Sequence, residues 1–141
     1  MADLVQTAAN VAVGVNTSVQ LVVAGEALTQ GMPVYRSSLD SNYYKADADA
    51  EASAEVKGIA VTPASASGDR FVLASPKSGA SADVNLGATL TQGETYVVST
   101  NAGAIAPIGD LTTGDYVTYL GVASSASILK MRLNPTAVQK P

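Results

Sequence analysis

Cysteine, histidine and tryptophan are all absent from this 141-residue chain. Without cysteine it can form no disulfide, no thiolate nucleophile and no zinc-thiolate site. Without histidine it lacks the commonest general base and metal ligand, so Ser-His-Asp, Cys-His and most transition-metal chemistry are excluded together. A catalyst would have to use carboxylates, lysine or tyrosine alone. We therefore predict that the protein is not an enzyme and takes no metal or other cofactor.

Charge is also scarce. Charged residues make up 14% of the chain, and the net charge of -4 comes with no basic cluster, so we predict no nucleic-acid partner. No apolar run approaches the length of about 18 residues that a membrane span needs, and the N-terminus has no basic region followed by an apolar run, so we predict no membrane association. These features predict a protein made in a reducing cytosol and kept there, or in a particle assembled there.

The residues that are abundant favour sheets. The hydrophobic fraction of 47% is carried mainly by alanine and valine, with six tyrosines and one phenylalanine. Core volume must therefore come from many small and β-branched side chains, which suit a pleated surface. At this length the chain can bury one core of ordinary single-domain size.

One segment occurs twice. Gly-Glu-Ala-Leu-Thr-Gln-Gly at 25–31 returns as Gly-Ala-Thr-Leu-Thr-Gln-Gly at 87–93, a constant shift of 62 positions. The likeness continues downstream, where 56–61 matches 119–124 at a shift of 63. We infer that one supersecondary unit was duplicated. The repeated segment predicts a turn that places its leucine in the core; it lacks the lysine that a phosphate-binding loop requires.

The predicted organisation is an N-terminal arm with the first strand (1–18), followed by a single β domain (19–141) that contains the repeats at about 25–75 and 87–133. We expect an all-β fold, a compact β-barrel or β-sandwich built from two similar β-units, with an extended N-terminal arm and at most one short helix. Alternating and β-branched runs predict strands at 11–15, 19–23, 33–35, 43–44, 58–61, 71–74, 96–98, 116–123 and 129–133.

Three segments are predicted to lie outside the strands. The bridge at 75–83 contains Pro76 and Gly79 and is expected to be a flexible loop, and the tail at 134–141 has little to bury and is expected to be loose. The alanine-rich run at 45–55 carries Asp47, Asp49, Glu51 and Glu55. It predicts a short exposed helix or a mobile loop; a calcium site is the alternative, although the glycine and closing glutamate of an EF-hand loop are missing.

Across nearly its whole length the chain resembles a known family. The residues that carry the likeness are the opening Met-Ala-Asp-Leu with Thr-Ala-Ala-Asn-Val, the paired Gly-x-x-Leu-Thr-Gln-Gly segments, Val-Tyr at 34–35 with Lys-Ala-Asp at 45–47, Gly-Ile-Ala at 58–60, Gly-Ala-Ile-Ala-Pro at 103–107, Gly-Asp-Tyr-Val at 114–117 and Leu-Gly-Val-Ala at 120–123. They resemble the capsid cement, or head decoration, proteins of tailed bacteriophages.

The resemblance implies an accessory structural protein of the virion. Such a protein is made in the host bacterial cytoplasm, binds the outer surface of the expanded icosahedral head, often as a homotrimer, and stabilises contacts between major capsid protein subunits. The N-terminal arm is a candidate for these contacts, because an extended segment can add a strand to a neighbour's sheet. We expect Leu4, Val5, Val11 and Val13 to take part; for Val11 and Val13, filling the protein's own core is an equal alternative.

Three other classes remain open at this point. A phage tail or head-fibre protein is also β-rich and would be told apart by its place on the virion. A carbohydrate-binding module would stack sugars on exposed rings, and six tyrosines are available, namely Tyr35, Tyr43, Tyr44, Tyr96, Tyr116 and Tyr119. A glycosidase would need paired carboxylates, but the acids lie among small residues that offer little apolar surface to shift a pKa.

Overall fold

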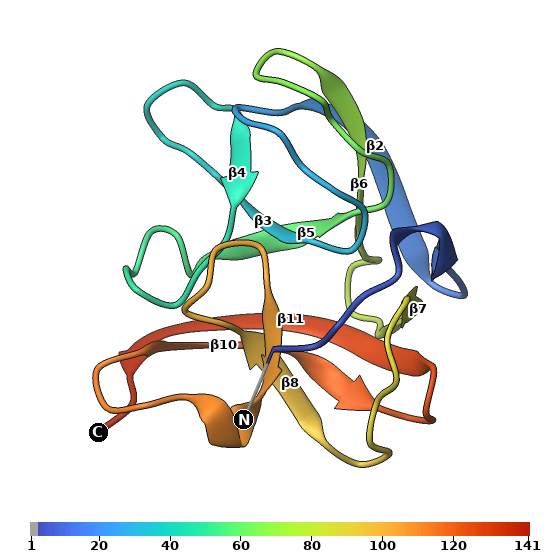
Figure 1. The fold of residues 1–141 in the computed structure, drawn as a ribbon, viewed down its shortest axis with the longest axis vertical. Coiled ribbons are helices and arrows are strands. Elements are labelled where there is room, and N and C mark those ends of the chain that lie inside the picture. Colours follow the sequence, from blue (N-terminus) through green and yellow to red (C-terminus); the bar gives the residue numbers. More distant parts are fainter. Residues whose placement is uncertain (1–2) are drawn as a thin grey trace.

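The computed structural model describes residues 3–141 and shows an all-β protein built from two antiparallel sheets. In Figure 1 the two sheets lie one above the other: the upper one holds β2 to β6, and the lower one holds β7 to β11 together with β1. Within the described residues the helical segments are two single 3-10 turns, η1 (Ala8–Asn10) and η2 (Ile108–Asp110). The predicted fold class is confirmed.

Each sheet has a simple order of strands. The lower sheet has six strands, in the order β1 (Val11–Val13), β7 (Ala82–Leu86), β11 (Ile128–Gln139), β10 (Tyr116–Ala123), β8 (Thr95–Val98) and β9 (Ile105–Pro107). The upper sheet has five, in the order β2 (Thr17–Val23), β6 (Arg70–Pro76), β5 (Val56–Ala60), β3 (Pro33–Arg36) and β4 (Tyr43–Lys45).

The two sheets repeat one topology. Numbered along the chain, the first unit (β2 to β6) and the second unit (β7 to β11) each place their first strand beside their fifth, then the fourth, the second and the third. The prediction of two similar β-units is therefore confirmed, and β1 is an additional strand on the edge of the second unit. β5 and β10, the fourth strand of each unit, lie inside their sheets rather than at an edge.

The repeated segment makes the same turn in both units. Leu28 and Leu90 are almost fully buried, with 2% and 4% of their surface exposed. The backbone N–H of Leu28 donates to the carbonyl of Ala64 at 2.9 Å, and the N–H of Leu90 donates to Ala126 at 2.8 Å. The predicted turn with its leucine in the core is thus confirmed twice.

Among the residues that the structure describes, the core has one large cluster and two smaller ones. The largest joins the units, because Val56 and Ile59 of β5 pack with residues of the second unit, among them Leu86, Leu129 and Met131. A second cluster lies within the first unit and includes Val34, Phe71 and Leu73. Side chains buried in this way contribute roughly 1.5–3 kcal/mol each, so the cluster that joins the two units makes one cooperative body of them.

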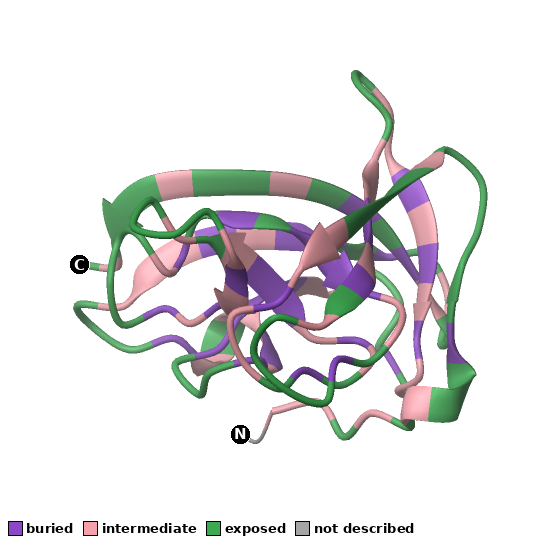
Figure 2. Ribbon diagram, turned by 90° about the horizontal axis from the view of Figure 1, so that it is seen from above, coloured by how far each residue is buried: buried purple, intermediate pink, exposed green. Residues whose placement is uncertain are grey.

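The predicted loose tail is wrong. β11 continues to Gln139, which pairs with Tyr116, and the hydroxyl of Thr136 donates to the carbonyl of Val117 at 2.6 Å. In Figure 2 the last part of β11, residues 132–139, is exposed or intermediate rather than buried. Backbone pairing and polar side chains hold this segment in place, and neither leaves an apolar pattern in the sequence.

The two predicted loops are also corrected. β6 runs to Pro76 and β7 begins at Ala82, so the bridge between the units is only 77–81. The acidic run is a loop rather than a short exposed helix, and its Ala46, Ala48 and Ala54 are buried. The N–H of Ala48 donates to the carbonyl of Ser99 at 2.9 Å, which fixes this loop of the first unit on the second. Alanine side chains are small enough to pack where two backbones approach closely. A segment without large apolar residues can therefore still be buried.

Candidate protein interface

The N-terminal arm lies along the protein's own second unit. The N–H of Leu4 donates to the carbonyl of Ile105 on the edge strand β9 at 2.8 Å. The carboxylate of Asp3 accepts hydrogen bonds from Ser99 Oγ at 2.6 Å and from Asn101 Nδ2 at 2.7 Å. The part of the extended arm that the structure describes therefore already bonds within the chain, and these groups are not free to pair with a neighbour's sheet.

Gln6 ties the arm to both units at once. Its side-chain Nε2 donates to the carbonyl of Gly31 at 3.0 Å and to the carbonyl of Leu86 at 2.9 Å. The next residue, Thr7, donates its N–H to the carbonyl of Gly87 at 2.6 Å. A Cβ on Gly31 would collide with Gln6, and one on Gly87 with Thr7. The last glycine of the first repeat and the first glycine of the second thus make room for the arm.

The structure divides the four predicted interface residues into two pairs. Val11 is only 9% exposed and lies in the core, paired with Leu86 across β1 and β7, and Leu4 packs partly buried against the largest core cluster. Val5 and Val13 point outward, with exposed fractions of 87% and 42%. Only Val5 and Val13 therefore present an apolar side chain to a partner without first leaving the protein's own core.

Three further exposed apolar residues follow in the same stretch and were not predicted as interface residues. They are Val15, Val19 and Leu21, each more than half exposed. No charged residue stands between Asp3 and Glu26. The sequence signal that could have found these residues is the long run without charge. This run ends in a strand with apolar residues on its exposed side. A surface that lacks charge and presents aliphatic side chains can bind protein at little desolvation cost.

The tyrosines do not gather into one sugar-stacking platform. Tyr43 and Tyr96 are buried, and Tyr43 meets Phe71 edge to face, with ring centroids 6.0 Å apart. The pair Tyr35 and Tyr44 is partly exposed, with centroids also 6.0 Å apart and ring planes tilted by 31°. This pair lies on β3 and β4, in the first unit.

A short hydrogen bond perturbs one acid and one phenol beside this pair. The Tyr44 hydroxyl donates to Asp40 Oδ2 at 2.6 Å. This bond lowers the pKa of the Asp40 carboxyl, helped by the N–H of Asn42, and it raises the pKa of the Tyr44 hydroxyl. Burial is the largest cause of the raised pKa of Tyr35, followed by the nearby charge of Asp47. The bond fixes the β3–β4 hairpin, and both groups keep their ordinary charge at neutral pH.

The acidic loop is organised by its own turn. Asp47 Oδ1 accepts from the N–H of Asp49 at 3.1 Å and from Ser53 Oγ at 2.7 Å. Within residues 3–141 no three carboxylates come close enough together to hold a metal ion. The calcium alternative therefore has no cluster of ligands in the described part of the chain.

Comparison with protein-family models, with curated proteins and with solved structures finds no match to the chain. A search of the described residues for a helix long and apolar enough to cross a membrane also finds none.

Proposed function

We propose that the protein is a structural component of a phage head, which binds the outside of the icosahedral shell and stabilises contacts between major capsid protein subunits. The proposal starts from the resemblance in sequence to capsid cement proteins. The observation that supports it in the structure is the uncharged stretch that follows Asp3, which carries the exposed side chains of Val5, Val13 and Val15.

The body of the protein suits this role physically. Two units that share one topology and one large core cluster form a stiff body, and the arm is fixed to both units by Gln6. A pre-ordered surface loses less conformational entropy on binding than a flexible one. A binding surface on such a body transmits load between the subunits it touches.

Reconstitution tests the proposal. Purified protein is added to expanded heads that lack it, and bound copies are counted by sedimentation followed by gel densitometry, with cryo-electron microscopy to locate the added density. Val5→Asp and Val13→Asp should each lower occupancy by about tenfold or more, because each places a charge in an apolar contact. Leu39→Asp is the matched control, since Leu39 is 95% exposed at the tip of the β3–β4 hairpin, outside the uncharged stretch.

The outcomes separate the candidate functions. Density on the head that bridges neighbouring subunits, lost with both valine variants and kept with Leu39→Asp, supports the proposal. Full occupancy by both valine variants would show that the head does not bind at the surface that carries Val5 and Val13. Density on the tail or on fibres supports the alternative structural role. Sugar binding is favoured only by the Tyr35 and Tyr44 pair, and a glycan array without signal excludes it for the glycans tested.

A further inference from the structure

β2 is a long sheet edge without a strand beside it. It spans Thr17–Val23, and within the described residues its one strand partner is β6. The other three sheet edges are strands of three residues each, β1, β4 and β9. Two of these are also covered: Tyr43 of β4 bridges to Ala24, and Leu4 bonds to β9.

The register of β2 shows which backbone groups point outward. Asn16 accepts from the N–H of Lys77 at 2.9 Å, and the N–H of Ala24 donates to Asp69 at 2.8 Å. Since hydrogen-bonded positions recur at every second residue of an antiparallel pair, the even-numbered residues of β2 bond to β6. The backbone N–H and C=O groups that face away from β6 belong to Thr17, Val19, Leu21 and Val23.

The second unit shows what covers such an edge. In the second unit, the residue that corresponds to Leu21 at the shift of 62 is Asp83 on β7. The carbonyl of Asp83 accepts from the N–H of Gly14, and its N–H donates to the carbonyl of Val15. The backbone positions that are outward and unpaired in β2 are thus paired in β7 with the antiparallel strand β1 and the residues after it. The fold already accepts a valine-bearing antiparallel strand at this position.

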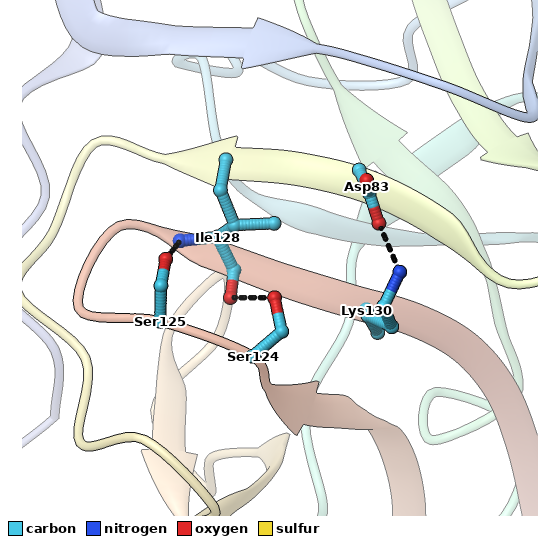
Figure 3. Close-up of polar contacts among 5 residues, drawn as sticks. All are labelled: Asp83, Ser124, Ser125, Ile128 and Lys130. Atoms are coloured by element: carbon cyan, nitrogen blue, oxygen red, sulfur yellow. Dashed lines mark hydrogen bonds and ion pairs between the residues drawn. The ribbon is translucent and has the colours of Figure 1, made fainter.

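The side chains at this edge are charged in the second unit but aliphatic in the first, and an aliphatic edge favours binding of a partner. Asp83 makes a 2.8 Å ion pair with Lys130, its direct neighbour on β11, and Figure 3 shows the two side chains pointing toward each other. Both are partly exposed, as expected of a surface pair. Leu21 is 60% exposed and Val19 is 54% exposed. The fold does not require aliphatic side chains here. Natural edges usually carry charge, proline or a bulge against pairing, and Thr17–Val23 has none of these.

We infer that β2 is a self-association site, at which a second copy of this chain pairs its own β2 in antiparallel orientation about a twofold axis at Gln20. This register places Val19 of one copy opposite Leu21 of the other, and Thr17 opposite Val23. All the outward backbone groups of the strand then bond to one another, because odd-numbered residues face odd-numbered residues. The four aliphatic side chains of Val19 and Leu21 from the two copies come together on one face.

The contact is closed and modest in size. A twofold contact uses the same surface on both copies and stops at the dimer. One seven-residue strand is a smaller interface than a permanent dimer uses. We therefore expect a mass that rises from the 14.2 kDa monomer towards twice that value as concentration increases from about 1 µM to about 1 mM.

Disulfide trapping tests the register directly, because the chain has no cysteine of its own. In the proposed register the two Gln20 residues form a non-hydrogen-bonded pair with Cα atoms about 4.5 Å apart, which suits a disulfide. Gln20→Cys should therefore give a covalent dimer under mild oxidation. Ser18→Cys is the matched control on the same side of the strand; its two copies would lie about 13 Å apart and should not cross-link.

Sedimentation velocity supplies the second measurement. Leu21→Lys should weaken the dimer by about tenfold or more, because it places a charge on the paired edge. Leu39→Lys introduces the same change at another exposed leucine and should leave association unchanged. A monomer at every concentration, a trimer that ignores Leu21→Lys, or equal cross-linking of both cysteine variants would each overturn the inference. The test uses the isolated chain, so failure to bind heads leaves its result unaffected.

Discussion

Gly58 and Gly121 occupy the same position in the two sheets. Gly58 pairs with Val34 across β5 and β3, Gly121 pairs with Tyr96 across β10 and β8, and a register shift adjoins this pair in both units. A Cβ on Gly58 would collide with the carbonyl oxygen of Ala74, and one on Gly121 with that of Lys130. The duplicated unit therefore keeps a close approach of its fourth and fifth strands that only glycine permits.

Gly121→Ala should destabilise the protein by about 1–3 kcal/mol, because the added methyl group meets backbone that cannot move without breaking the pairing of β10 with β11. Denaturant unfolding followed by circular dichroism measures the change. Gly109→Ala is the control, since a Cβ at Gly109 has no heavy atom within 4 Å. Equal unfolding midpoints for the two variants would contradict the close approach.

The sequence could predict the repeated parts of the fold because they combine two signals. Alternation marked the strands, and the recurrence of Gly-x-x-Leu-Thr-Gln-Gly showed that one arrangement is used twice. Leu28 and Leu90 then had to play one role, and both are buried. Strand order was not predictable, because side-chain alternation says which face is buried but not which strand lies beside which.

The segments that were mispredicted are held by contacts that leave no apolar pattern. Alanine side chains dock the acidic loop, with Ala46 and Ala48 fully buried. Gln6 and the backbone of Leu4 dock the arm. For the candidate interface, the sequence pointed to a stretch of chain without charge, but whether Val5 or Val11 faces solvent depends on the path of the arm between the two units.

Thr136→Val should lower the free energy of unfolding by about 1–2 kcal/mol, because it removes the 2.6 Å bond to the carbonyl of Val117 and the bond that the N–H of Val138 donates to the same hydroxyl. Chemical denaturation measures the loss. Thr89→Val changes an exposed threonine in a loop and should have little effect. If both variants unfold alike, the last part of β11 contributes nothing to stability.

Gln6→Ala should destabilise the protein by about 1–3 kcal/mol, since it leaves the carbonyls of Gly31 and Leu86 without their side-chain donor. Amide hydrogen exchange should quicken at Leu4 and Thr7, whose N–H groups bond to the second unit. Val5→Ala, one residue away and 87% exposed, is the control and should leave stability unchanged. Deleting residues 1–10 is for this reason a poor test of attachment, because it would weaken the fold as well.

Tyr44→Phe should flatten the dependence of stability on pH at both ends of the range. The bond to Tyr44 lowers the pKa of Asp40, so its contribution is present above the ordinary aspartate value of about 4 and is lost as pH falls through the folded value. The same bond raises the pKa of Tyr44, so the stabilisation is present below about pH 10 and is lost as pH rises through the folded value.

Removing the hydroxyl removes both effects together. The variant should be less stable than the parent protein at neutral pH, and the difference should shrink in acid and in alkali. Unfolding midpoints measured across the pH range give the result, and a carboxyl titration by nuclear magnetic resonance should show the pKa of Asp40 rising towards its ordinary value. Tyr116→Phe is the matched control, because Tyr116 is likewise partly exposed but lies on β10 in the second unit. A difference that stays constant from acid to alkali would mean that the Asp40 and Tyr44 bond does not form in solution.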